Sequence, residues 1–471
     1  MMWNFKEHHL HPAAITDSGE VITYQQLEHA ADSFAQNISS RSLVFSLCTN
    51  TIGALVGYAG LINNKHIPLL VDSFLDRDAL RKLADLYRPA YVWLPTDLAD
   101  QLPGFTPVYN DYGYLLLKTH FAQDSPLFDE LGLLLTTSGS TGSPKLVRLT
   151  LKNLEANMLS IVEYLQPNSS ERPITTLPMN YSYGLSIINS HLAVGATLLL
   201  TTSSLIEKGF WTFFKEQGAT SFGGVPYTYE MLDKLRFYRM AGLESLKTMT
   251  QAGGKLSPYL QQKFAEYAQS AGIRFFVMYG QTEATARMSY LPSEYALSKC
   301  GSMGIAIPGG AFFLVDDNGN VVEGSDQEGE LVYRGANVSL GYAECREDLA
   351  KGDENNGVLF TGDMARRDAD GYYYITGRKK RFIKIFGNRV NLDEAEHLVK
   401  TLVSECACCG VDDQMLIYVT EHGTEAEIRQ LITSKTGIHH SAFTVKVIPE
   451  ILKNESGKIQ YSALGAGGVD V

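Results

Sequence analysis

Several features that define other protein classes are missing from this chain of 471 residues. Basic residues are in the minority, with 40 Lys and Arg against 52 Asp and Glu, which argues against a general nucleic-acid-binding surface. The two long stretches without Asp, Glu, Lys or Arg, 43–64 and 174–206, are punctuated by Asn, Thr, Ser and Gly, unlike a membrane-spanning helix. The start of the chain shows no apolar core of a secretory signal. We therefore expect a cytoplasmic protein with no stable membrane insertion and no nucleic-acid partner.

Cysteine is scarce, with six residues that show no disulfide pattern of a secreted protein. Cys406, Cys408 and Cys409 form a C-x-C-C cluster, which does not have zinc-finger spacing and has no second Cys/His pair at a matching distance. Segment 405–411 is instead typical of a buried strand in which cysteine acts as a small hydrophobic residue. The sequence thus predicts structural thiols and no metal site here.

The most informative segment of the chain is 133–147, LLLTTSGSTGSPKLV. An apolar run over 131–135 predicts a buried strand, and a loop of Thr, Ser and Gly follows it up to Pro144 and Lys145. Such a loop offers unhindered backbone N–H groups, many hydroxyls and one ammonium group. These groups suit a polyphosphate ligand.

The obvious alternative is the P-loop of kinases and ATPases, which requires the spacing G-x-x-x-x-G-K-[ST]. Here Gly139 and Gly142 are three residues apart, and Leu146 stands where a Mg²⁺-binding Ser or Thr is needed. The spacing therefore excludes a Walker A loop and disfavours a P-loop kinase or NTPase.

The pattern of the chain predicts an α/β fold with more than one domain, since 471 residues exceed a single core. Short apolar strands alternate with helical segments over 22–200; among these are a strand at 43–48, a helix from about Ile52 and an amphipathic helix directly after the loop. From about Gly301 the strands are short and bounded by Gly, Asp and Asn, which indicates a β-rich subdomain. We expect a large N-terminal domain of α/β layers over 1–376 and a small, mobile C-terminal α+β domain over 377–471.

Six further motifs follow the loop in a fixed order. They are TQAGGKL (250–256), MYGQTEAT (278–285), GELVYRGANVSLGY (329–342), LFTGDMARRDADGYYYITGR (359–378), RFIKIFGNRVNLDEAE (381–396) and KNESGKIQ (453–460). Together they resemble the adenylate-forming (AMP-binding) superfamily: acyl- and aryl-CoA ligases, nonribosomal peptide adenylation domains and luciferases. The resemblance runs from about Thr23 to Ile459.

The resemblance implies an ATP site. It assigns ATP binding to Thr137, Ser138, Gly139, Ser140, Thr141, Gly142, Lys145, Gly253, Gly254, Tyr279, Gly280, Gln281, Asp363 and Arg378. In this interpretation the loop holds the β- and γ-phosphates, Tyr279 stacks on adenine, and Asp363 accepts from the ribose hydroxyls with Arg378 beside them.

Three catalytic residues and one metal ligand are also implied by the resemblance. Thr282 donates to the α-phosphate, Glu283 ligates Mg²⁺ with hard oxygen, and Lys458 bridges the carboxylate and the α-phosphate. Lys384, the third catalytic residue, belongs to the second half-reaction. Simpler interpretations of Glu283, Lys458, Asp363 and Arg378 are an acid at a helix start, a surface loop lysine, a turn cap and an ordinary salt bridge.

In the second half-reaction of this superfamily the small domain rotates and presents another face. The hinge position matches Lys380, and Lys384 with Gly387 matches the pantetheine tunnel. The basic run 378–389 either meets a CoA phosphate or an acidic carrier protein, or is in part a solvated face, notably at Lys379 and Arg381.

The acid pocket is expected around the motif LPMNYSYGLS at 177–186. The implied pocket residues are Tyr181, Ser182, Tyr183, Gly184, Gly224, Val225 and Tyr227, with Gly223, Gln251, Ala252 and Gly253 completing the wall. Activators of amino acids usually place Asp at the position of Ser182, and an unpaired buried ammonium is costly, so an α-amino acid is disfavoured. Core packing is the alternative role for Tyr183 and Tyr227.

The sequence therefore predicts an ATP- and Mg²⁺-dependent carboxylic acid ligase. It would form an acyl-adenylate with release of pyrophosphate, and transfer the acyl group to the thiol of CoA or of a separate carrier protein's 4′-phosphopantetheine. The alternative within the superfamily is a stand-alone nonribosomal-peptide-type enzyme that activates an amino acid for a separate carrier protein. A nucleotide-binding pseudoenzyme is disfavoured because Glu283, Asp363 and Lys458 are all present.

Overall fold

The structure is a computed structural model that describes residues 2–122, 125–136, 145–385, 388–411, 413–436, 438–453 and 459–466. Its internal contacts divide the chain into two compact units. The first comprises Met1–Thr137, Ser143–Ala311 and Tyr333–Leu359, and the second comprises Ser138–Gly142, Phe312–Val332 and Phe360–Val471. Each unit consists of three segments, so the division does not correspond to a single cut of the chain. The expected domain boundary between residues 376 and 377 stays a prediction.

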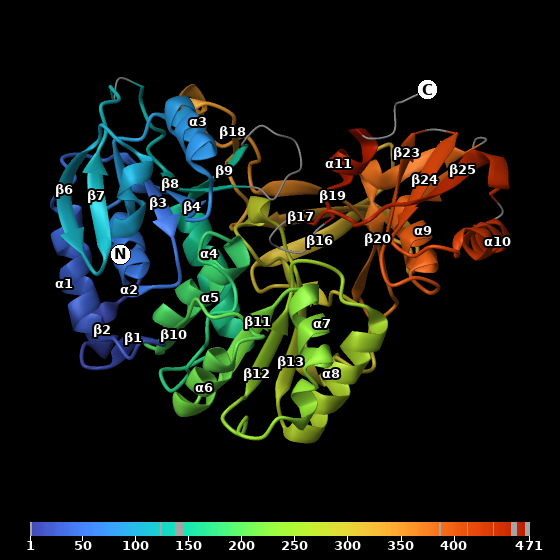
Figure 1. The fold of residues 1–471 in the computed structure, drawn as a ribbon, viewed down its shortest axis with the longest axis horizontal. Helices are drawn as coiled ribbons and strands as arrows, with labels where there is room; N and C mark the ends of the chain where they lie inside the picture. Colours follow the sequence, from blue (N-terminus) through green and yellow to red (C-terminus); the bar gives the residue numbers. More distant parts are fainter. Residues whose placement is uncertain are drawn as a thin grey trace. The chain divides into compact units, whose positions relative to one another are not determined.

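The first unit contains a sheet of eight described strands (Figure 1). In spatial order they are β18 (Gly341–Ala343), β9 (Leu146–Thr150), β8 (Leu131–Thr136), β4 (Ile67–Asp72), β3 (Leu43–Cys48), β5 (Tyr91–Pro95), β7 (Tyr114–Lys118) and β6 (Thr106–Asp111). The four middle strands are parallel, and antiparallel strands flank them on both sides. The middle strands are nearly continuous apolar runs, as strands covered on both faces must be.

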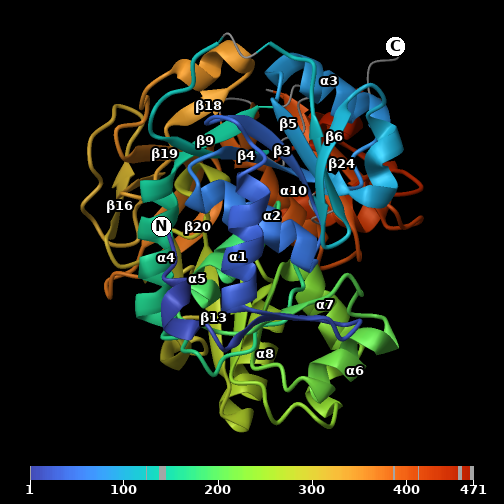
Figure 2. The same ribbon diagram turned by 90° about the vertical axis from the view of Figure 1, so that its left-hand side faces the viewer.

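Helices cover both faces of this sheet. Helices α1 (Tyr24–Ala35) and α2 (Ile52–Asn63) lie side by side on one face (Figure 2), and α3 (Arg77–Tyr87) covers the other. Successive side chains of β3 point to opposite faces of the sheet: Val44 belongs to the core under α2 and Phe45 to the core under α3.

A second sheet of the first unit positions the site. Its described strands are β11 (Ser221–Gly224), β12 (Thr248–Gln251), β13 (Arg274–Tyr279), β14 (Ser289–Leu291) and β15 (Ile305–Ala306). The first three are parallel, so their carboxyl ends, Gly224, Gln251 and Tyr279, meet at one edge of the sheet. Ligands of open α/β sheets bind at such an edge.

The helices around the second sheet are α4 (Leu151–Leu165), α5 (Ser182–Leu192), α6 (Lys208–Glu216), α7 (Pro226–Lys234) and α8 (Pro258–Ala271). A three-stranded sheet of β10 (Leu198–Leu200), β1 (Pro12–Thr16) and β2 (Val21–Thr23) completes the unit. Every residue of α5 is buried: Leu185 packs into the core of the first sheet, while Ile187 faces Gly223 of β11. Helix α5 therefore touches both sheets.

The second unit consists of short strands and three described helices. Its strands are β16 (Gly310–Val315), β17 (Glu328–Gly335), β19 (Val358–Arg367) and β20 (Tyr373–Arg378), the hairpin β21 (Phe382–Ile385) and β22 (Asn388–Asn391), and the sheet β23 (Cys406–Val411), β24 (Gln414–Val419) and β25 (Phe443–Val447). Its helices are α9 (Leu392–Val399), α10 (Glu425–Thr436) and α11 (Tyr461–Ala466).

The cysteine cluster lies on β23, as predicted. Cys406 and Cys408 are free thiols in the core between β23, α9 and α10, and burial raises the pKa of Cys406 to about 12. Among the described residues no group of His, Cys, Asp and Glu side chains is arranged to hold a metal ion. These thiols act as small apolar side chains.

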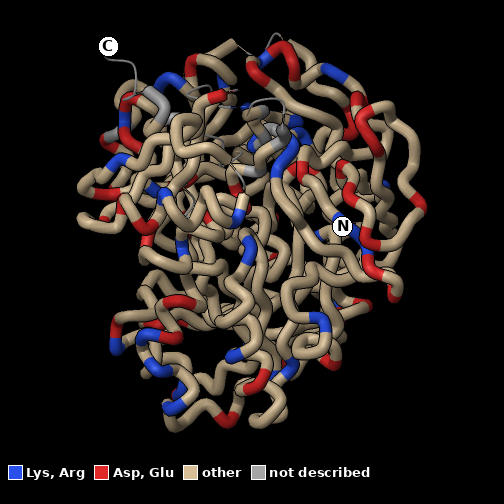
Figure 3. The backbone as a smooth tube through the Cα atoms, turned by 90° about the vertical axis from the view of Figure 1, so that its right-hand side faces the viewer, with Lys and Arg blue, Asp and Glu red and all other residues tan. Residues whose placement is uncertain are grey.

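The predicted elements of the first unit are confirmed. The strand at 43–48 is β3, the helix from Ile52 is α2, the apolar run before the loop is β8, and the amphipathic helix after it is α4. None of the described helices is long and apolar enough to cross a membrane. Figure 3 shows Lys and Arg interspersed with Asp and Glu along the backbone.

Candidate active site

The loop that follows β13 places the predicted catalytic threonine, Thr282, and the predicted metal ligand, Glu283, in one 3-10 turn (Thr282–Ala284). Gly280 allows this turn, because a Cβ atom there would lie 1.7 Å from the carbonyl oxygen of Ala286. Thr285 has a φ of +69°, which is costly for a β-branched residue, and its Oγ1 donates to the carbonyl of Asn337 at 2.7 Å. The turn is thus a strained conformation that its surroundings hold in place.

The hydroxyl of Thr282 lies 3.2 Å from the hydroxyl of Ser182, the first residue of α5. When Ser182 donates in this pair, the single proton of Thr282 is free to donate to another acceptor. The predicted acid-pocket motif and the predicted phosphate-binding loop after β13 therefore meet at this point.

The carboxylate of Glu283 has a partner that sequence reasoning missed. The hydroxyl of Tyr342, on β18, donates to Oε1 of Glu283 at 2.7 Å. Lys145 lies over the ring of Tyr342 with Nζ 5.6 Å from the centroid, and pairs with Glu344 at 2.8 Å. Burial and the neighbouring Glu283 raise the pKa of Tyr342, so this hydroxyl stays protonated and a donor.

The segment after β12 approaches the acid-pocket motif closely. Gly253 has a φ of +83°, and a Cβ atom on it would lie 2.5 Å from the hydroxyl of Tyr181 and 3.0 Å from Val225. Nε2 of Gln251 donates to the carbonyl of Gly254 at 2.9 Å, while its buried Oε1 has no hydrogen-bond partner among the described residues. An unpaired buried acceptor beside two glycines fits an incoming ligand with N–H donors.

Tyrosine hydroxyls lie where the acid wall is predicted. The hydroxyl of Tyr183 lies 2.7 Å from Oγ1 of Thr250, and Tyr229 donates to the carbonyl of Thr250 at 2.8 Å. Burial raises the pKa of Tyr181 to about 12 and raises that of Tyr183 further, so both are neutral donors at physiological pH. The wall therefore offers hydroxyls and no negative charge.

The glycines of this wall have no room for a side chain. A Cβ atom on Gly184 would lie 2.3 Å from the carbonyl oxygen of Pro178, and one on Gly224 would lie 2.7 Å from Thr228. Tyr227 stands apart, with 53% of its surface exposed on α7.

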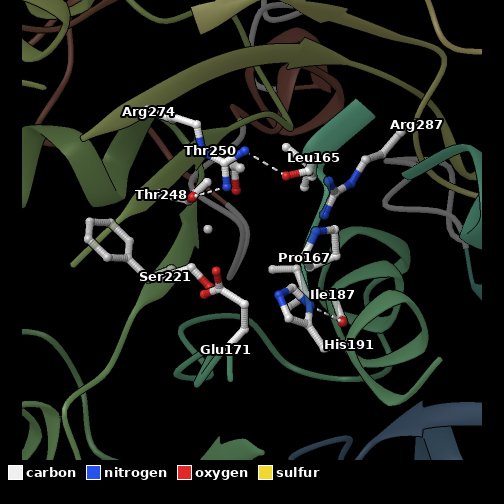
Figure 4. Close-up of a pocket in the computed structure, with 12 residues that line it drawn as sticks. Leu165, Pro167, Glu171, Ile187, His191, Ser221, Thr248, Thr250, Arg274 and Arg287 are labelled. Atoms are coloured by element: carbon white, nitrogen blue, oxygen red, sulfur yellow. Dashed lines mark hydrogen bonds between the residues drawn. The ribbon is translucent and has the colours of Figure 1, made fainter. Parts of the chain in front are cut away.

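A cavity adjoins Tyr183 on the face of α5 that turns toward the second sheet. Ile187, His191, Gly223, Thr250 and Arg287 are among the residues that line it (Figure 4). Arg287 follows Glu283 by four residues, and sequence reasoning did not single it out.

In the second unit, Asp363 and Arg378 lie together on the paired strands β19 and β20. Oδ1 of Asp363 is 3.5 Å from Nε of Arg378, and Asp363 is 6% exposed. Oγ1 of Thr361 accepts from the backbone N–H of Asp363 at 3.1 Å. The predicted ribose pair is thus brought together in one place.

Two of the basic residues that follow Arg378, Lys379 and Arg381, have acidic partners. Lys379 pairs with Glu330 at 2.8 Å, and Arg381 pairs with Asp393 and Glu396 at 2.5 Å each. Arg381 is therefore a structural cation, neither a solvated residue nor a free contact for CoA.

Some predicted residues fall outside the described part of the chain. They are Thr137, Ser138, Gly139, Ser140, Thr141, Gly142, Gly387 and Lys458. The backbone is described at Lys380, in the turn Lys379–Arg381, and at Lys384, which pairs with Arg389 in the hairpin of β21 and β22. The functions assigned to all the site residues stay predictions.

A model of the AMP-binding enzyme family matches residues 2–343, and the chain belongs to this family. It is 28% identical over 347 residues to the oxalate–CoA ligase of Arabidopsis thaliana, a match that covers 70% of this chain and 66% of that protein. It is 29% identical over 400 residues to the sulfoacetate–CoA ligase of Cupriavidus necator, covering 82% and 74%. The crystal structure of ATP-bound MatB from Rhodopseudomonas palustris has the same fold, with a TM-score of 0.79, 20% identity and coverage of 98% and 97%. The predicted fold and family, and the predicted class of AMP-forming acid–thiol ligase, are confirmed.

Proposed function

We propose that this chain activates a small carboxylic acid with ATP and Mg²⁺ and then passes the acyl group to the thiol of CoA. The observation that carries the proposal is the pair of Ser182 and Thr282, which joins the acid-pocket helix to the motif loop after β13. The names of the relatives, both CoA ligases, support CoA as the acceptor over a carrier protein.

In the first half-reaction an oxygen of the acid attacks the α-phosphorus of ATP, the bond to the β-phosphate oxygen breaks, and pyrophosphate leaves. Negative charge builds on the α-phosphate oxygens during this step. The hydroxyl of Thr282 donates a hydrogen bond to these oxygens. The hydroxyl of Ser182 orients the Thr282 hydroxyl by donating to its oxygen. A fixed donor aimed at developing charge is the largest single source of catalysis in such sites.

The residues at the motif loop also fit a magnesium ion. Mg²⁺ in nucleotide sites is held by one or two carboxylates, by water and by the phosphates themselves, and Glu283 supplies such a carboxylate. The hydroxyl of Tyr342 fixes one oxygen of Glu283 and leaves the other for the ion. When bound, the ion supplies positive charge to the phosphate oxygens.

In the second half-reaction the thiol sulfur attacks the acyl carbon, the bond to the phosphate oxygen breaks, AMP leaves, and the thiol proton passes to solvent. Lys458 for the first half-reaction and Lys384 with Gly387 for the second keep the roles that the resemblance implies. Asp363 and Arg378 would hold the ribose, and Tyr279 the adenine.

An amino acid as substrate is supported less well. Ser182 provides a hydroxyl where a carboxylate would pair with the α-ammonium, and this hydroxyl is already beside Thr282. The neutral tyrosines of the wall add no negative charge.

The test is acid-dependent exchange between ATP and labelled pyrophosphate over a panel of small acids and α-amino acids. The active acids are then offered CoA or phosphopantetheinylated carrier proteins, and the thioester is identified by mass. We expect exchange with carboxylic acids and a CoA thioester. Exchange with an α-amino acid alone would contradict the proposal.

A further inference from the structure

Arg287 is a buried cation without an acidic partner among the described residues. Its surface is 2% exposed, and no described carboxylate lies within ion-pair distance of its guanidinium. By contrast Arg148, which is also fully buried, pairs with Glu354 at 2.5 Å. Burying a charge without a counter-ion costs folding free energy, which indicates a functional role for Arg287.

All the described contacts of the Arg287 side chain are to uncharged groups. Its Nε donates to Oγ of Ser186 at 3.0 Å and its Nη1 to the hydroxyl of Tyr164 at 2.9 Å, with Sδ of Met278 at 3.5 Å. The ring of Tyr183 lies 5.3 Å from its Cζ. These contacts fix the guanidinium in place, and none of them carries a negative charge.

The charge faces a cavity between α5 and the second sheet (Figure 4). Two cations, Arg287 and Arg274, line it, with a single carboxylate, Glu171, which accepts from the hydroxyl of Thr220. Burial lowers the pKa of His191, another lining residue, to about 4, so this ring is neutral at physiological pH. The lining therefore carries a net positive charge.

The cavity adjoins the predicted acid wall. Gly223 and Thr250 line the cavity, and the hydroxyl of Tyr183 lies 2.7 Å from Oγ1 of Thr250. A Cβ atom on Gly223 would lie 2.8 Å from both the hydroxyl of Tyr183 and Cδ1 of Ile187, so the wall is closely packed at this level.

Arg287 lies a short distance from the predicted position of the reacting carboxylate. Ser182, beside Thr282, and Ser186, which accepts from Arg287, are one turn apart on α5, about 6 Å along the helix axis. A group held by Arg287 is therefore separated from the activated carboxylate by a few carbon atoms.

We infer that the substrate is a short acid with a second anionic group, a carboxylate or a sulfonate, which binds Arg287 at the closed end of the pocket. The inference rests on the proposed function and names its substrate class. A guanidinium binds both kinds of anion through paired N–H donors.

The test compares malonate, succinate, glutarate and the sulfonate sulfoacetate with analogues of about the same size (the monoamides) that keep the reacting carboxylate and carry a neutral carboxamide or sulfonamide in place of the second anionic group. Adenylation is followed by pyrophosphate exchange. We expect at least one dianion to exceed its monoamide by about 10²-fold in kcat/KM, since a buried charge recognition site rejects an uncharged analogue strongly. The active dianion should also raise the melting temperature of the wild-type protein.

Variants then assign the preference to Arg287. Arg287→Gln should bring the ratio of dianion to monoamide to within a few-fold of one and abolish the melting-temperature shift, and Arg287→Lys should restore part of both. The matched control is Arg172→Gln, because the guanidinium of Arg172 donates to the carbonyl of Gln217 and does not line the cavity. This control should keep the preference.

The outcomes separate this inference from the proposed function. Exchange with monocarboxylates or monoamides as good as with dianions would overturn the inference and leave the proposed function standing. Absence of exchange with every acid would overturn the proposed function itself. If Arg287→Gln does not fold, the ratio of dianion to monoamide in kcat/KM, measured for the wild type and for Arg287→Lys, tests the inference.

Discussion

The hydroxyl oxygens of Ser182 and Thr282 lie 3.2 Å apart, although the two residues are 100 positions apart in the chain. One stands at the first turn of α5, which is predicted to form the acid wall, and the other in the turn after β13. A displacement of α5 therefore moves the hydrogen-bond partner of Thr282, the residue expected to contact the α-phosphate. The residues predicted for acid binding and for phosphate chemistry share this contact.

The first prediction concerns this pair. Thr282→Val removes the hydroxyl with little change of shape and should slow acid-dependent pyrophosphate exchange by about 10²-fold, the scale for one transition-state donor. Ser182→Ala removes the partner alone and should cost about tenfold or less, the scale of one neutral hydrogen bond. If Ser182→Ala were the more damaging change, the assignment of the donor to Thr282 would be wrong.

The second prediction concerns the metal ligand. Glu283→Gln should raise the Mg²⁺ concentration for half-maximal exchange by about tenfold or more, because a charged contact is worth about 1.5–3 kcal/mol. Tyr342→Phe removes the donor to Glu283 but keeps its charge, and should shift this concentration less. The measurement is a Mg²⁺ titration at fixed ATP. Equal shifts in both variants would show that Glu283 acts through Tyr342.

The third prediction concerns the motif turn and is measured as stability. Gly280→Ala forces a methyl group against the backbone carbonyl of Ala286 and should cost about 2 kcal/mol or more in the free energy of unfolding. Gly272→Ala is the control: its φ of +68° is strained for alanine, but no atom lies within 4 Å of the new Cβ. It should cost about 1 kcal/mol. Urea unfolding measures the free energy of unfolding of both variants. A larger loss for Gly272→Ala than for Gly280→Ala would contradict the prediction.

The fourth prediction is a pH dependence of stability. Burial lowers the pKa of His191 from 6.5 to about 4, so the unfolded chain binds a proton here more readily than the folded protein. This contribution is fully present above pH 6.5 and is lost as the pH falls toward 4, up to about 3 kcal/mol.

His191→Asn tests this pH dependence. It keeps an N–H near the carbonyl of Ile187, which lies 2.8 Å from Nδ1, and it does not titrate. The unfolding free energy of the wild type, relative to the variant, should decline between pH 6.5 and pH 4.5. A constant difference over this range would show that the ring is not held neutral.

Local patterns of the sequence sufficed for the layers of the first unit. The strand at 43–48 and the helix from Ile52 could be predicted because apolar runs, a Thr/Asn boundary and periodicity are all local signals. The uncharged stretch 174–206 hid α5, because a helix buried on all sides has no polar face to reveal its period.

Long-range contacts of the site could not be predicted in this way. Tyr342 reaches Glu283 from β18, 59 residues away; the backbone N–H of Ser339, just before β18, donates to the carbonyl of Glu283, a contact between distant segments that no local pattern reveals. Arg287 reads as an ordinary basic residue in the sequence, and its burial without a carboxylate becomes visible only in the packed structure. Motifs give the chemistry of a site, whereas packing gives its charge balance.

The most direct test of the central claim is the product of ATP cleavage by the purified protein. With an accepted acid and no thiol, the account predicts acid-dependent exchange of pyrophosphate into ATP, and, after addition of CoA, stoichiometric AMP and acyl-CoA. Formation of ADP, or ATP cleavage that does not depend on the acid, would contradict it.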